Sequence, residues 1–284
     1  MAPTIDFTRS ASADTAISAA VGDANRSSAN RLKVKNVKDD VKAVQTLLKR
    51  MADTFPVQTD RKRPYSVDPG RVNGNCGTRT IGAIDNLQRW FFGSSDGRIA
   101  PDGKTLSYMC EVLAGEFSMH IRPATNKSLV SLMQEKKGQV YFFGARVPKW
   151  NQHWRGPWDC AELVAWGLNL TCGGYLGDHL IGCRKKARGF HDAHTGHFLQ
   201  DLKSLSKRKN PKNAKQMVTE EVDFGYAKKT AGVIGVKKGH IYVSAGNGTT
   251  IEAKGGTGKR AVREMTVRER RKYSFWKVNL MAYL

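Results

Sequence analysis

Residues 156–168, near the middle of the chain, contain signals for the start of a helix. The helix that follows is apolar on most of its sides. Pro157 and Asp159 are of the residue types that favour the start of a helix. The next residues supply its buried faces, namely Leu163, Val164, Trp166 and Leu168. A helix that is apolar on several sides has to lie inside a sizeable core. Cys160 therefore falls in the first turn of a buried helix.

The length and composition allow such a core. The chain has 284 residues, of which 40% are hydrophobic and 25% charged, which excludes global disorder and allows one large or two ordinary domains. No apolar run approaches the roughly 18 residues of a membrane-spanning helix, so we expect no membrane insertion. The first residues lack a continuous apolar stretch, and we expect no secretory signal peptide.

The net charge is strongly positive and unevenly distributed. Lys and Arg outnumber Asp and Glu by 47 to 25, for a formal charge of +22. Residues 126–284 carry an excess of 17 basic side chains, against 5 in residues 1–125. This balance favours an anionic partner: nucleic acid, a membrane surface or an acidic cell-wall polymer. No helix-turn-helix, RNP-like or zinc-finger spacing supports nucleic acid, so we expect no nucleic-acid partner.

Two interpretations of Cys160 follow from its position. The helix macrodipole and the free backbone N–H groups of a first turn favour a thiolate, and the same N–H groups can stabilise an oxyanion. The alternative is a small buried core cysteine, the more common fate of a lone cysteine. The choice between them depends on whether the chain also supplies a base.

A candidate base lies in residues 239–253, which are typical of two strands joined by a Gly-Asn-Gly turn. His240 starts the first strand and Glu252 lies near the end of the second, so a hairpin brings the two together. Glu252 can then accept a hydrogen bond from the imidazole, which fixes its tautomer and favours the imidazolium. Cys160, His240 and Glu252 thus form a candidate catalytic triad.

These motifs together resemble the NlpC-type and related CHAP cysteine peptidases and amidases. Residues 159–164 (DCAELV) match the family's DCSGLV with two changes, and residues 240–248 match its HVGIYxGNG with one inserted residue. Glu252 stands at the family's third catalytic position, which often holds His. The resemblance covers about residues 130–284. It implies an α+β, papain-like fold and a thiol hydrolase that needs no metal or organic cofactor.

Three further residues are candidates for this site. The resemblance implies that Tyr141, in a Tyr-x-x-Gly sequence upstream of the nucleophile, supports the oxyanion site together with Asp159. Trp158 is our candidate for substrate binding. Trp150 and Trp154 precede it, and the three tryptophans either line a substrate groove or pack beneath the catalytic helix.

The N-terminal part of the chain has a different pattern. Residues 1–35 are rich in small and polar residues without an apolar period, and we expect a flexible arm there. Helical periodicity then predicts three short helices, the first capped by Asp39 or Asp40, over residues 37–52, 80–92 and 104–114. Residues 53–78 are rich in Pro and Gly and are predicted to form a loop.

The three predicted helices and their turns resemble the small peptidoglycan-binding domain of many cell-wall hydrolases. The matching sequences are residues 41–48, 72–80, 83–88 and 102–106. A purely structural spacer is the alternative. The chain is therefore predicted to divide into the arm, a peptidoglycan-binding-like helical domain over 36–120 and a hydrolase domain over 121–284.

Two features leave alternatives open. The five cysteines allow bridges such as Cys76–Cys110 and Cys172–Cys183, or none. The histidines of an HxxHxxH sequence are candidate zinc ligands or belong to a polar surface helix near the active-site groove, namely His191, His194 and His197. We favour the surface helix and expect no metal.

The resemblance implies a peptidoglycan hydrolase that cuts an amide of the stem peptide, with D-glutamyl–diamino acid cleavage favoured and muramoyl-alanine amidase activity or a phage-type lysin as alternatives. A non-catalytic wall-binding protein and a basic nucleic-acid toxin are the competing classes. Residues 16–48 also resemble the start of type VI secretion effectors. This implies export from the producing cytoplasm into a target bacterium's periplasm, a secretion-spike partner and an immunity protein.

Overall fold

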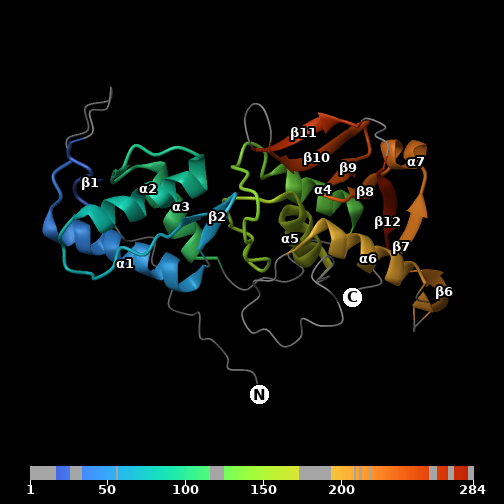
Figure 1. Ribbon diagram of the computed structural model, residues 1–284, viewed down its shortest axis with the longest axis horizontal. Coiled ribbons are helices and arrows are strands. Elements are labelled where there is room, and N and C mark those ends of the chain that lie inside the picture. Colours follow the sequence, from blue (N-terminus) through green and yellow to red (C-terminus); the bar gives the residue numbers. More distant parts are fainter. Residues whose placement is uncertain are drawn as a thin grey trace, which may run out of the picture. The chain divides into compact units, whose positions relative to one another are not determined.

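The computed structural model describes residues 17–25, 34–55, 57–115, 125–172, 193–207, 209–210, 213–217, 219–255, 261–267 and 272–280 (Figure 1). The chain forms two compact units, which combine helices with an antiparallel sheet. The helical unit contains residues 1–116 and 153–156, and the sheet unit contains 117–152 and 157–284. None of the helices in the described residues is long and apolar enough to cross a membrane.

The helical unit contains three of the predicted helices, α1 (Lys38–Thr54), α2 (Thr78–Phe92) and α3 (Lys104–Leu113). The apolar stripe predicted for α1 is buried throughout, at Val41, Val44, Leu47, Leu48 and Met51. Short antiparallel pairs join β1 (Val21–Gly22) to β4 (Arg98–Ile99) and β2 (Gln58–Asp60) to β3 (Arg63–Tyr65). The second pair lies in the segment predicted to be a loop.

The prediction for the arm is wrong for residues 17–25, which are built into the helical unit. The Asp40 carboxylate accepts hydrogen bonds from the Ser18 backbone N–H at 3.0 Å, the Ser18 hydroxyl at 2.8 Å and the Ala19 N–H at 2.9 Å. Asp40 therefore fixes this segment and does not cap α1, whose N-cap is Val37. Burial opposes ionisation here, but the bonds from Ser18 and Ala19 outweigh it and lower the pKa of Asp40.

One short segment of the chain folds away from its sequence neighbours. Residues 153–156 belong to the helical unit, where Trp154 is fully buried. Its ring lies 5.2 Å from that of Phe55 and 6.4 Å from that of Trp90. The Arg155 guanidinium pairs with Glu111 of α3 and lies over the Tyr108 ring.

The sheet unit is built on six antiparallel strands in the order β11-β10-β9-β8-β12-β7. Their bounds are β7 (Thr219–Val222), β8 (Ala231–Lys237), β9 (His240–Ala245), β10 (Thr249–Lys254), β11 (Ala261–Thr266) and β12 (Ser274–Val278). A separate short pair joins β5 (Lys209–Asn210) and β6 (Asn213–Met217). The helices are α4 (Asn126–Gln134), α5 (Cys160–Cys172), α6 (Thr195–Ser206) and α7 (Phe224–Lys229).

Both faces of the central strands are covered. Successive residues of β8 and β9 point to opposite faces, and all of Val233, Ile234, Ile241, Tyr242 and Val243 are buried. Helices α4 and α5 contact β9 and β10, while α7 contacts β8, β9 and β12. Gly235 faces Tyr242, whose ring lies 2.4 Å from where a Cβ would stand, so the strand needs glycine there.

Candidate active site

Cys160 is the first residue of α5, which is buried along its whole length. Asp159 precedes the helix, and its Oδ1 accepts the Ala161 backbone N–H at 2.9 Å, which satisfies one free donor of the first turn. Cys160 itself is 6% exposed. The structure confirms that a helix starts at Cys160 and that this residue is buried.

The environment of the thiol favours its neutral form. Burial raises the pKa of Cys160, and the adjacent charge of Asp159 raises it further, while a backbone hydrogen bond from Ile241 acts in the opposite direction. The sequence predicts that the helix start favours the thiolate, but burial outweighs that effect at Cys160. Because the thiol keeps its proton at neutral pH, nucleophilic attack requires a base.

His240 and Glu252 are brought together by the predicted hairpin of β9 and β10. Thr250 stands opposite Ser244 and Ile251 opposite Val243, and this register places Glu252 diagonally from His240 on the same face. Glu252 Oε2 is hydrogen-bonded to His240 Nε2. The carboxylate is 4% exposed and the imidazole 14%, so the pair is shielded from water.

The hairpin also reaches Cys160. Ile241, directly after His240, directs its backbone N–H at the Cys160 thiol, and α5 packs against β9. Since Nε2 of His240 is bound to Glu252, Nδ1 is the ring nitrogen left to accept a proton. The Ile241 contact thus brings the start of β9, where His240 pairs with Glu252 of β10, against the start of α5.

Asp159 and Tyr141 join the start of α5 to residues 141–144, which precede it in the chain. Asp159 is 9% exposed, and its Oδ2 accepts the Gly144 backbone N–H at 3.1 Å. Burial raises the pKa of Asp159, and its hydrogen bonds to Ala161 and Gly144 only partly offset this. Tyr141 forms a parallel bridge with Trp158, and its ring lies against Gly255, just beyond β10.

Trp158 has a packing role. Its side chain is fully buried, its indole N–H donates to Gln139 Oε1 at 2.7 Å, and its ring lies edge-on to Trp166 of α5 at 5.0 Å. Trp150 and Trp154 are buried as well. Packing against the helix of Cys160 therefore describes Trp158, which offers no exposed surface to a substrate in this structure. Trp154 packs in the helical unit instead, against Phe55 and Trp90.

Glu162 and Lys149 form an ion pair beside Cys160 that the sequence patterns do not predict. Their ion pair, at 3.0 Å, is almost fully buried, with side chains 2% and 1% exposed. Glu162 also accepts the Val147 N–H at 3.2 Å and the Ala193 N–H at 2.6 Å. It thereby ties two other segments to the helix of Cys160. The available signal was the one charged residue of a helix that is otherwise uncharged and mostly apolar, because a buried carboxylate needs a partner.

The open alternatives are partly resolved. Cys76 and Cys110 carry free thiols, so no bridge joins them, whereas Cys183 lies outside the described residues. Among the residues that the structure describes, no group of three His, Cys, Asp or Glu side chains is placed to hold a metal ion. His194 and His197 lie with ring centroids 5.2 Å apart, while His191 is outside the described part of the chain.

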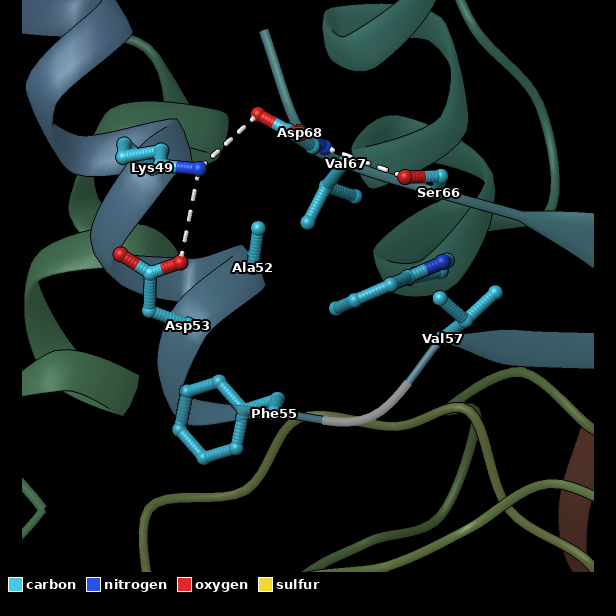
Figure 2. Close-up of a pocket in the computed structure, with 9 residues that line it drawn as sticks. Lys49, Ala52, Asp53, Phe55, Val57, Ser66, Val67 and Asp68 are labelled. Atoms are coloured by element: carbon cyan, nitrogen blue, oxygen red, sulfur yellow. Dashed lines mark hydrogen bonds and ion pairs between the residues drawn. The ribbon is translucent and has the colours of Figure 1, made fainter. Parts of the chain in front are cut away.

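A cavity of about 220 Å³ opens in the helical unit (Figure 2). Phe55, Val57 and Val67 give it apolar walls. At its edge the Lys49 ammonium lies 3.6 Å from Asp53 and 3.5 Å from Asp68. The cavity therefore has apolar walls and a rim that carries one ammonium and two carboxylate groups, which suits a ligand with an apolar group.

Comparison with known proteins adds no assignment. The chain matches no protein-family model, and no curated protein is significantly similar to it.

Proposed function

We propose that this protein is a cysteine peptidase or amidase that cuts an amide bond in the stem peptide of peptidoglycan. The carrying observation is the pairing of His240 with Glu252 next to an Ile241 N–H directed at the Cys160 thiol. A thiol, an imidazole and an orienting carboxylate are the parts of a thiol hydrolase. The helix on an antiparallel sheet is compatible with the papain-like fold implied by the NlpC-type resemblance.

The proposed reaction has two steps. His240 Nδ1 takes the Cys160 proton as Sγ bonds to the substrate carbonyl carbon, and backbone N–H groups at Cys160, with Tyr141, hold the oxyanion. The C–N bond breaks, the amine leaves with the proton from His240, and a thioester remains. Water, deprotonated by His240, then attacks the thioester, releases the acid and returns the thiol. Glu252 stabilises the imidazolium in both steps.

The test is digestion of purified sacculi with mass analysis of the released fragments. We expect the wild type to release new fragments and Cys160→Ala to release none. Cys110→Ala, which removes a half-buried thiol in the other unit, is the control and should keep full activity. A newly freed α-amine on the diamino acid marks D-glutamyl endopeptidase activity, and one on L-alanine marks muramoyl-alanine amidase activity.

Other outcomes would overturn the proposal. Equal digestion by wild type and Cys160→Ala would exclude a thiol mechanism. Binding to sacculi without cleavage by either would favour a wall-binding protein. Degradation of DNA or RNA with intact sacculi would favour the nucleic-acid toxin.

The proposed setting is antibacterial. The resemblance to type VI effectors, the basic charge and the wall substrate together support delivery into the periplasm of a target cell, with a spike component as carrier and an immunity protein in the producer. Expression with and without a periplasmic leader tests this setting. Toxicity should require the leader and Cys160, and toxicity confined to the cytoplasm would contradict wall hydrolysis.

A further inference from the structure

His194 is held between the two elements that carry Cys160 and His240. The residue before it, Ala193, donates its N–H to Glu162 on α5, two residues beyond Cys160. The residue after it, Thr195, accepts the N–H of Gly239 at Oγ1 at 3.0 Å, one residue before His240. Both neighbours of His194 are thus fixed to catalytic elements, so His194 lies at their junction.

The imidazole of His194 is exposed, whereas the groups beside it are buried. Cys160 and Asp159 are 6% and 9% exposed, while His194 belongs to the exposed class. Its charge acts on Asp159 and opposes the burial that raises the pKa of that carboxyl. The backbone on both sides of His194 is thus tied to the elements that carry Cys160 and His240, and its side chain is open to solvent.

An exposed imidazole suits an anionic group of a substrate. It donates hydrogen bonds and, when protonated, adds a positive charge. His240 is already bound to Glu252, and Asp159 to the N–H groups of Gly144 and Ala161. Among His194, His240 and Asp159, the imidazole of His194 is the most exposed and so the best placed to meet a substrate.

We propose that His194 is a substrate-contacting residue that binds a free carboxylate next to the scissile amide and so selects between carboxylate and amidated stem peptides. The identity of the peptide rests on the proposed function, whereas the placement of His194 does not. Amide bonds of the stem peptide have free carboxylates close by, most directly the α-carboxylate of a D-glutamate linked through its side chain.

The test uses two synthetic muropeptides that differ only in this D-glutamate α-carboxylate, free in one and amidated in the other. We expect the wild type to prefer the free carboxylate. In His194→Ala, KM for that peptide should rise about 10-fold or more, as expected for a charge-assisted hydrogen bond. Its kcat, and both constants for the amidated peptide, should change little. Gln200→Ala, an exposed change on α6, the helix that follows His194, is the matched control and should keep the preference.

Calorimetry on the Cys160→Ala protein, with and without His194→Ala, separates the two proposals. In one outcome, the wild type cuts neither peptide while the Cys160→Ala protein binds the free-carboxylate peptide more tightly than the amidated one. If His194→Ala removes that difference in affinity, the His194 proposal stands and the hydrolase proposal fails. If the peptides are cut and His194→Ala keeps the wild-type preference, or weakens both peptides equally, the His194 proposal fails alone. If the peptides are neither cut nor bound, both proposals fail.

Discussion

In the proposed mechanism, Glu252 determines which nitrogen of His240 is available to the thiol. Its bond to Nε2 leaves Nδ1 for proton transfer, and its 4% exposure keeps water from competing for the carboxylate. A charge-assisted hydrogen bond in such a place is stronger than at the surface. The orientation of the His240 ring therefore depends on one carboxylate.

We predict that Glu252→Gln lowers kcat for muropeptide cleavage about 10²–10⁴-fold, as seen when the orienting carboxylate of a triad is replaced by its amide. The amide can still hydrogen-bond but cannot stabilise the imidazolium. Steady-state kinetics and a thermal melt measure the effect and check the fold. Glu264→Gln, on the adjacent strand β11, is the control, and a loss below 10-fold in Glu252→Gln would remove Glu252 from the mechanism.

The buried ion pair of Glu162 and Lys149 leads to a prediction about stability. Glu162→Gln leaves the Lys149 ammonium buried without its counter-charge and should cost about 3–5 kcal/mol in the free energy of unfolding. Lys149→Met combined with Glu162→Gln should recover part of this loss, because no unpaired charge remains. Urea denaturation measures both variants. Equal stability of Glu162→Gln and wild type would mean that Lys149 is not held as described.

One side chain of α1 holds the N-terminal segment of the helical unit. Asp40 of α1 holds residues 17–25 in place through three hydrogen bonds. Its pKa is lowered in the folded state, so its contribution to stability is present above the unfolded value of about 4 and is lost as the pH falls through the folded value. The helical unit should therefore lose this contribution in acid.

We predict that Asp40→Asn destabilises the chain by about 1–3 kcal/mol at neutral pH, as expected for hydrogen bonds to a charged group. The difference from wild type should shrink as the pH falls below about 4. Denaturant titrations at several pH values measure it. Asp39→Asn, the exposed neighbour in the same turn, should show a much smaller difference, and a gap that persists in acid would contradict the role of the Asp40 charge.

The cavity beside α1 gives another test at the scale of an element. Ala52 lines the cavity and is partly exposed, so Ala52→Phe should fill it without disturbing the core. If the helical unit binds wall glycan or peptide there, sacculus binding by the Cys160→Ala protein should weaken about 10-fold. Thr46→Phe, an exposed change on the same helix, should not weaken binding. Equal binding by the two variants would assign the cavity no role.

The elements differ in how far sequence predicts them. Helices α1, α2 and α3 are marked by apolar periodicity, and the β9–β10 hairpin by its Gly-Asn-Gly turn. Other contacts join parts of the chain that are far apart in sequence. They include the pairing of Val21 with Ile99, the position of β12 between β8 and β7, and the hydrogen bond from Ala193 to Glu162. No local pattern encodes such partners, so the supporting contacts of the site became visible only in the fold.

The net positive charge of the chain acts over longer distances than any single contact. Residues 126–284 carry most of the excess positive charge, which should draw the protein to an anionic wall over distances that salt shortens. We predict that raising the salt from about 0.1 M to 1 M, which cuts the Debye length from about 10 Å to 3 Å, weakens sacculus binding by Cys160→Ala at least 10-fold. Sacculi with amidated carboxylates are the control and should bind weakly at both salt concentrations. Binding that ignores salt would leave the charge unexplained.

The membership of residues 153–156 in the helical unit limits how this protein can be recombined. Separating the units would require cuts at three places in the chain, not one. A gene fragment that starts after residue 116 would still encode Trp154 while omitting Phe55 and Trp90, against which its indole packs. An exchange of the N-terminal module between related proteins must therefore preserve a fitting pocket for this tryptophan, so the two parts have to be inherited as a matched pair.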